Sequence, residues 1–127
     1  MKKELRVAIL GATGAVGQEF LLILEQRNFP IADTEGRPGG SPLLLASKKS
    51  AGKTAKFRGR EIKIEEARPE SFKEIDLVLA SAGAAVSREL VPHAVKLGAV
   101  VVDNTSACRM DPQVPLVIPE INPQDIE

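Results

Sequence analysis

A glycine-rich turn near the start of the chain constrains the fold more than any other feature. Residues 6–10 form a short apolar run rich in β-branched side chains, which predicts a strand buried on both faces. Gly11, Gly14 and Gly17 follow, and between residues 15 and 27 apolar side chains recur at helical spacing. A strand that passes through such a turn into an amphipathic helix is typical of Rossmann-type α/β domains. There the turn approaches a dinucleotide pyrophosphate and the helix N-terminus favours its negative charge.

The rest of the chain alternates strands with helices. Apolar runs predict strands at residues 43–46, 75–80 and 99–102. Residues 86–97 have the pattern of a second amphipathic helix, in which Pro92 must introduce a kink or begin the second half. Strands that alternate with helices pair in parallel through right-handed crossovers. We therefore expect one α/β domain of Rossmann type, with a doubly wound, mainly parallel sheet.

Three segments lie outside this alternation. The glycines and prolines of residues 33–42 predict a surface loop. The alternation around Phe57 and through Ile62 and Ile64 predicts a small hairpin. The apolar residues 116–118 are a candidate for a further strand.

The loops that follow the predicted strands contain most of the small and polar residues of interest. They comprise residues 11–17, 47–53, 81–85 and 103–109. Because ligands bind beyond the carboxyl ends of parallel strands, all four loops are expected to meet at one edge of the sheet.

The loop after residues 43–46 bears on which dinucleotide is bound. An NAD site usually places an acid at the end of the second strand, to bind the ribose hydroxyls, whereas a 2′-phosphate requires cations. Here that position offers Ser47, Lys49 and Ser50 instead, and hydroxyl and ammonium groups suit a phosphate. If the strand is misplaced, Asp33 or Glu35 is the candidate acid and the lysines form a solvated turn. The sequence favours NADP over NAD.

Composition excludes several other classes of protein. The 17 basic and 17 acidic residues balance, so no nucleic-acid or membrane surface is indicated, and no apolar run reaches the roughly 18 residues that span a bilayer. One cysteine permits no internal disulfide, which fits a cytoplasmic location. Cys108 has no base beside it in the sequence and His93 has no partner. We interpret Cys108 as a packing residue and His93 as a surface residue.

Several longer stretches together form a distinctive series. They are residues 7–17, 25–30, 45–53, 81–83, 103–107, 109–112 and 114–120. In this order they resemble the landmarks of the N-terminal domain in the aspartate-β-semialdehyde dehydrogenase family, and the resemblance covers nearly the whole chain.

The resemblance implies a function and a set of site residues. Members of the family reversibly convert aspartate semialdehyde, NADP and phosphate to β-aspartyl phosphate and NADPH, in lysine, threonine and methionine biosynthesis. The resemblance implies that the pyrophosphate is bound by Gly11, Thr13, Gly14, Ala15 and Val16, and the 2′-phosphate by Ser47, Lys49 and Ser50. By the same resemblance, the nicotinamide side is lined by Ser81, Gly83 and Asn104, and the substrate is bound by Arg109 together with Asn104.

Departures from the family pattern limit what this chain is expected to do. The position of Lys49 is commonly arginine in bacterial members, and the position of Cys108 is typically aromatic. The family's nucleophilic cysteine and acid–base histidine lie beyond residue 127, in a C-terminal catalytic and dimerisation domain. The resemblance thus implies that residues 1–127 bind NADP without catalytic turnover, and that homo-oligomers form only in the full-length enzyme.

Other interpretations stay open at the level of sequence. An N-acetyl-γ-glutamyl-phosphate reductase shares the fold and the acyl-phosphate chemistry, although residues 104–107 and 109–111 favour the first family. Extended short-chain dehydrogenases have a similar turn but commonly use a catalytic tyrosine, which this chain lacks. A non-catalytic NADP-binding regulatory module is the alternative from a different class.

Overall fold

A six-stranded sheet forms the centre of the computed structural model, which describes residues 4–33 and 40–126. In the sheet the strands lie in the order β3-β4-β2-β1-β5-β6, and every neighbouring pair is parallel except β3 with β4. This confirms the predicted Rossmann-type α/β class. The elements are β1 (Val7–Leu10), α1 (Ala15–Gln26), β2 (Leu43–Ala46), β3 (Thr54–Phe57), β4 (Arg60–Glu66), the 3₁₀ helix η1 (Pro69–Phe72), β5 (Leu77–Ala80), α2 (Ala84–Lys96), β6 (Val100–Asp103) and the 3₁₀ helix η2 (Pro123–Ile126).

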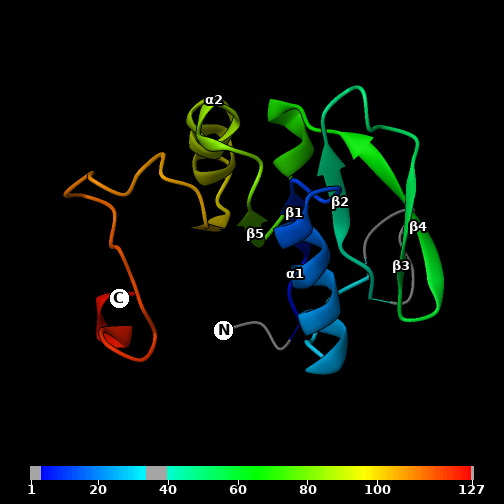
Figure 1. Cartoon of the computed structure of the whole chain (residues 1–127), viewed down its shortest axis with the longest axis horizontal. Helices are drawn as coiled ribbons and strands as arrows, with labels where there is room; N and C mark the ends of the chain where they lie inside the picture. Colours follow the sequence, from blue (N-terminus) through cyan, green and yellow to red (C-terminus); the bar gives the residue numbers. More distant parts are fainter. Residues whose placement is uncertain (1–3, 34–39, 127) are drawn as a thin grey trace.

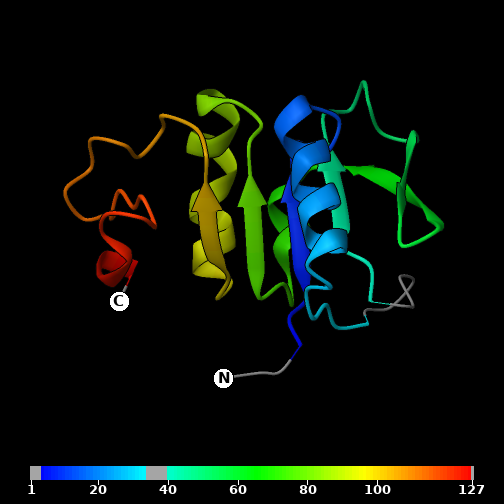
Figure 2. The ribbon, with the colours of Figure 1, turned by 60° about the horizontal axis from the view of Figure 1, so that its bottom comes forward.

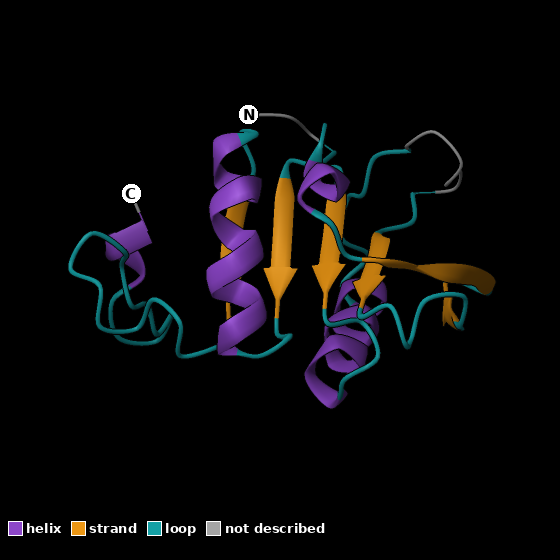
Figure 3. Cartoon of the chain, turned by 90° about the horizontal axis from the view of Figure 1, so that it is seen from above, coloured by secondary structure: helices purple, strands orange, loops and turns teal. Residues whose placement is uncertain are grey.

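The two long helices cover opposite faces of the sheet. Figure 2 shows α1 in front of the strands and α2 behind them, and Figure 3 shows α2 from its own side. The central strand β1 supplies both cores, because Val7 and Ile9 pack on the α1 side while Ala8 and Leu10 pack on the α2 side. A strand covered on both faces has no polar face, which explains its uninterrupted apolar sequence.

The predicted hairpin is confirmed, and it belongs to the main sheet. Strands β3 and β4 are antiparallel, and Arg58 and Gly59 between them have φ values of 50° and 75°. Such a two-residue turn matches the twist of the strands that it joins. Strand β4 also pairs in parallel with β2, with Leu44 opposite Ile64. This pairing brings the end of β4 beside the end of β2.

Helix α2 begins at Ala84, two residues before the predicted start, and continues through Pro92 as one element. The loop predicted at residues 33–42 lies partly outside the described residues. Within it, residues 40–42 are buried rather than on the surface, because they lead directly into the central strand β2.

The predicted strand at residues 116–118 is wrong. These residues pair with no described strand, and Leu116 and Ile118 are exposed. After β6 the chain leaves the sheet and turns through loops to η2 (Figure 1). Among the described residues, no helix has the length and apolar content needed to cross a membrane.

Candidate functional site

The glycine-rich turn is tightly packed between β1 and α1. Gly11 has a φ of 94°, and a Cβ atom there would lie 2.6 Å from the carbonyl oxygen of Ser81. At Gly17 a Cβ atom would overlap the carbonyl oxygen of Gly11. The amides of Gly11 and Ala12 both donate to the carbonyl oxygen of Leu45, at 2.9 and 3.0 Å. The fold itself therefore requires glycine at positions 11 and 17.

Gly14 differs from these two glycines. Its φ is −76°, and the nearest atom to a Cβ there is the Gly11 carbonyl oxygen at 3.5 Å, an ordinary contact. Packing of the chain does not require glycine at this position. Gly14 is also the N-cap of α1, without a side-chain cap and without an acid in the first helical turn. A bare backbone at a helix N-terminus lets a phosphate approach the free amides closely, so this residue favours a ligand site over a purely structural turn.

A cavity of about 470 Å³ opens beside this turn, which is within the usual size range of ligand sites. It lies where β1, β2 and β5 end, as expected for a parallel sheet. The residues that line it are Leu10, Gly11, Thr13, Gly14, Ala46, Ser47, Ala67, Arg68, Pro69, Ser81, Ala82, Val86, Glu89 and Leu90.

The end of β2 carries no acid. Ser47 follows this strand directly, as the sequence predicted, and it lines the cavity. Asp33 lies before β2, and its Oδ1 accepts a hydrogen bond of 2.6 Å from the amide of Gly40, so it does not stand at the carboxyl edge. Glu35 lies outside the described residues. Glu89, the acid that lines the cavity, comes from α2.

The structure brings together only some of the predicted site residues. Gly11, Thr13, Gly14, Ser47 and Ser81 line one cavity. The others do not line it, although they too follow the ends of strands in this sheet. Ala15 and Val16 form the first turn of α1, Lys49 and Ser50 follow β2, Gly83 is the N-cap of α2, and Asn104 and Arg109 follow β6.

The loop after β6 adjoins the end of β5. The amide of Asn104 donates to the carbonyl oxygen of Ala80 at 2.9 Å, while Arg109 is exposed further along the loop. Asp103 Oδ1 accepts a hydrogen bond of 2.8 Å from the amide of Thr105, which shapes the turn. The Oδ2 atom of Asp103 is buried and has no hydrogen-bond partner in the described part of the chain.

Sequence reasoning missed the part of the cavity that β4 and α2 provide. Ala67, Arg68 and Pro69 reach the cavity because β4 pairs in parallel with β2. Val86 and Glu89 reach it from the first half of α2. No local motif marks these residues, so only the order of the strands could have revealed them.

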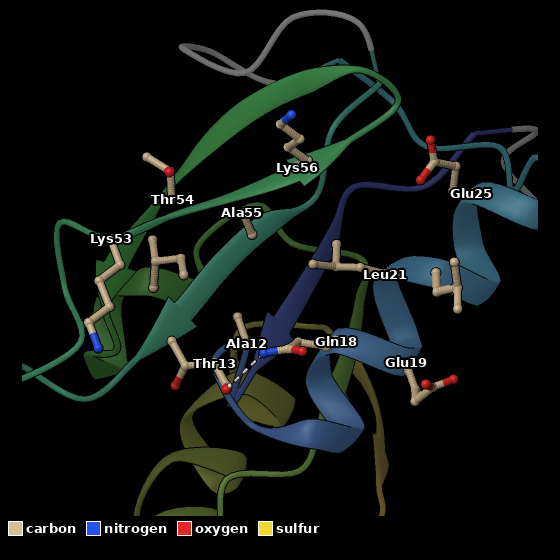
Figure 4. Close-up of a pocket in the computed structure, with 12 residues that line it drawn as sticks. Ala12, Thr13, Gln18, Glu19, Leu21, Glu25, Lys53, Thr54, Ala55 and Lys56 are labelled. Carbon is tan, nitrogen blue, oxygen red and sulfur yellow. Dashed lines mark hydrogen bonds between the residues drawn. The ribbon is translucent and has the colours of Figure 1, made fainter.

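A second hollow of about 630 Å³ lies on the α1 side of the hairpin. Figure 4 shows Lys53 and Lys56 on the hairpin side of this hollow, and Glu19 and Glu25 on α1. Thr13 lines both hollows. The α1 hollow draws on the loops after β1 and β2 only, whereas the first cavity draws on the ends of β1, β2 and β5. We take the first cavity as the candidate site.

Cys108 and His93 lie on different elements. Cys108 is half-buried in the loop after β6, and His93 is exposed in the last turn of α2. Helix α2 begins at the carboxyl edge of the sheet, so His93 lies about 15 Å along the helix axis from that edge. Among the described residues, no group of histidine, cysteine and acidic side chains could hold a metal ion.

Comparison with known proteins identifies the family. A family model described as "Semialdehyde dehydrogenase, NAD binding domain" matches residues 6–127. The chain belongs to this family. The semialdehyde dehydrogenase match makes the cavity part of a domain that binds a nicotinamide cofactor, in agreement with the bare backbone of Gly14.

Relatives of this semialdehyde dehydrogenase domain confirm the resemblance found in the sequence. The chain is 52% identical over 126 residues to an aspartate-semialdehyde dehydrogenase of Bacillus subtilis, covering 99% of this chain and 34% of that protein. It is 50% identical over 123 residues to the enzyme of the same name from Aquifex aeolicus, covering 96% and 34%. The chain thus spans about a third of the length of these relatives.

Solved structures agree with the sequence relatives. Aspartate semialdehyde dehydrogenase II of Vibrio cholerae, in a complex with ASA, has a TM-score of 0.86 at 40% identity, with 97% of this chain and 38% of that chain covered. The aspartate semialdehyde dehydrogenase of Candida albicans with NADP has a TM-score of 0.75 at 33% identity, with 94% and 35% covered.

Proposed function

We propose that this chain is the NADP-binding domain of an aspartate-semialdehyde dehydrogenase. The observation that carries the proposal is the cavity at the end of β2. It combines a bare helix N-terminus at Gly14 with the hydroxyl residue Ser47, and β2 offers no acid for a ribose. The names of the relatives support this enzyme over an N-acetyl-γ-glutamyl-phosphate reductase.

In this proposal the lining residues divide the cofactor between them. The Gly14 amide donates to the Gly11 carbonyl oxygen, so the pyrophosphate is left to the amides of Thr13 and of Ala15 and Val16 in the first turn of α1, where the helix dipole favours anions. Ser47 serves the adenosine end, and Ser81 serves the nicotinamide side. The nicotinamide ring, when bound, supplies the acceptor or donor of a hydride.

The proposal extends to the loop after β6. Asn104 lies next to the end of β5, and Arg109 is an exposed guanidinium further along this loop. We assign Arg109 to the phosphate of the acyl-phosphate substrate, because its planar fork binds such anions through two hydrogen bonds. The full-length enzyme then converts aspartate semialdehyde, NADP and phosphate reversibly to β-aspartyl phosphate and NADPH.

Calorimetric titration of the chain with NADP and NAD tests the cofactor assignment. We expect NADP to bind about tenfold more tightly or better, because a charge-assisted contact to the additional phosphate is worth about 1.5–3 kcal/mol. Repeating the titration at high salt should narrow the difference, since the contact is partly exposed. Equal affinities, or tighter binding of NAD, would contradict the proposal.

A further inference from the structure

The structure places one basic side chain, Arg68, in the wall of the cavity. Strands β2 and β4 are paired in parallel with Ala46 opposite Glu66, and the amide of Ala67 donates to the carbonyl oxygen of Ala46 at 2.8 Å. The residues that follow β2 and those that follow β4 therefore begin next to each other. As a result, Arg68 and Ser47 both line the cavity.

Arg68 is held at its backbone and at Nε. Its amide donates to Ser71 Oγ at 3.0 Å, and Pro69 begins η1 directly after it. Its Nε donates to Glu66 Oε2 at 3.2 Å. In the described part of the chain the two terminal guanidinium nitrogens make no hydrogen bond, and the side chain is 62% exposed. Arg68 therefore retains the pair of donors with which arginine binds phosphate.

The lysines near Ser47 in the sequence do not line the cavity. Lys48 and Lys49 are exposed, and neither lines the cavity. Lys53 lines the α1 hollow instead, as Figure 4 shows. Among the described residues around the cavity, Arg68 is the only base.

We propose that Arg68, together with Ser47, binds the 2′-phosphate of NADP and sets the preference for NADP over NAD. This inference rests on the proposed function, since it requires that the cavity takes the adenosine end of the cofactor. The terminal nitrogens of Arg68 donate to the phosphate oxygens, while Glu66 holds the guanidinium through Nε. Arg68 thus takes the part that the sequence had assigned to Lys49.

Titration with two fragments of the cofactor isolates the phosphate contact. Adenosine 2′,5′-bisphosphate carries the 2′-phosphate and 5′-AMP lacks it. We expect Arg68→Met to lower the affinity for the bisphosphate by about tenfold or more and to leave the affinity for 5′-AMP unchanged. Arg68→Lys keeps the charge but loses the fork, so it should retain part of the affinity. Arg27→Met is the matched control, because Arg27 is exposed at the C-terminal end of α1, whereas the cavity lies at the N-terminal end.

The possible results separate the two proposals. An unchanged affinity of Arg68→Met for the bisphosphate overturns the role of Arg68. An equal loss for both fragments also overturns it, since Arg68 would then act on the adenine or on folding. Thermal unfolding of each variant shows whether the fold is intact, and Arg68→Gln replaces Arg68→Met if that variant unfolds. Equal affinities of the unsubstituted chain for NADP and NAD contradict the proposed function, and with it the role of Arg68 that rests on it.

Discussion

Gly11, Gly14 and Gly17 share one turn but serve different purposes. Gly11 and Gly17 lie against backbone atoms that leave no room for a Cβ, whereas Gly14 has ordinary space around it. The regular spacing of the glycines therefore has two separate causes. Packing requires glycine at positions 11 and 17, whereas the ligand favours it at position 14. A sequence motif cannot distinguish them, because both demands select the same residue.

Alanine substitutions separate the two demands. We expect Gly14→Ala to cost less than about 1 kcal/mol of unfolding free energy, yet to weaken NADP binding by about tenfold, since the methyl group stands where a phosphate approaches. Gly17→Ala should lower the unfolding free energy by about 3 kcal/mol or more, because backbone atoms must move. Urea unfolding and calorimetry measure both quantities. Undiminished NADP binding by Gly14→Ala would show that the turn is structural only.

Helix α2 contains a proline, a residue that disfavours the interior of a helix. Pro92 lies inside the 13-residue helix and is exposed, so the carbonyl group one turn earlier lacks its usual donor. The helix nevertheless continues, because Ser87, Leu90 and Ala94 hold it against the sheet. Here tertiary packing outweighs the local preference.

Replacing this proline should stabilise the domain. We expect Pro92→Ala to raise the unfolding free energy by about 1–2 kcal/mol, because the restored hydrogen bond outweighs the greater freedom of the unfolded chain. Arg88→Ala, another exposed position of α2, serves as the control and should stay within about 0.5 kcal/mol of the unsubstituted chain. Denaturant unfolding provides the measurement. A lower stability of Pro92→Ala would show that the helix depends on the proline.

The elements that the sequence predicted well are those whose signal is local. The strands β1 and β2 are uninterrupted apolar runs beside glycines or polar loops, and α1 has a regular apolar period. Residues 116–118 are apolar too, but a strand requires a partner, and no local pattern shows whether one is present. Arg68 was missed for the same reason. It comes to the same cavity as Ser47 through the pairing of β4 with β2, although the two residues are 21 positions apart in the sequence.

At the scale of the whole molecule, the parallel strands gather the binding groups at one edge of the sheet and leave the reactive ones apart. Gly14, Ser47 and Ser81 lie at the carboxyl edge, where the cavity forms. Cys108 follows β6 at this edge, but His93 lies toward the other end of α2. Nucleophilic catalysis requires a thiolate and a base within hydrogen-bonding reach of their targets, and Cys108 and His93 lie on different elements of the described part of the chain.

We therefore predict that the 127-residue chain binds NADP but does not reduce it. The assay follows NADPH formation from aspartate semialdehyde, NADP and phosphate, comparing this chain, its Cys108→Ala variant and a chain extended to the length of the relatives. Only the extended chain should be active, and Cys108→Ala should leave NADP affinity unchanged. Turnover by the 127-residue chain that disappears in Cys108→Ala would identify Cys108 as a nucleophile. It would contradict the prediction that this chain binds NADP without reducing it.

The cavity exists only while β1, β2 and β5 are paired, since each contributes part of its wall. An unfolded chain has no such cavity, so a cofactor that fills it binds the native state alone. At a hundredfold excess over its dissociation constant, this stabilises the native state by about 2.7 kcal/mol. Proteases that attack the open chain then find roughly a hundredfold fewer open molecules. Under the proposed function, the rate at which a protease cleaves the chain should therefore fall as the concentration of NADP rises.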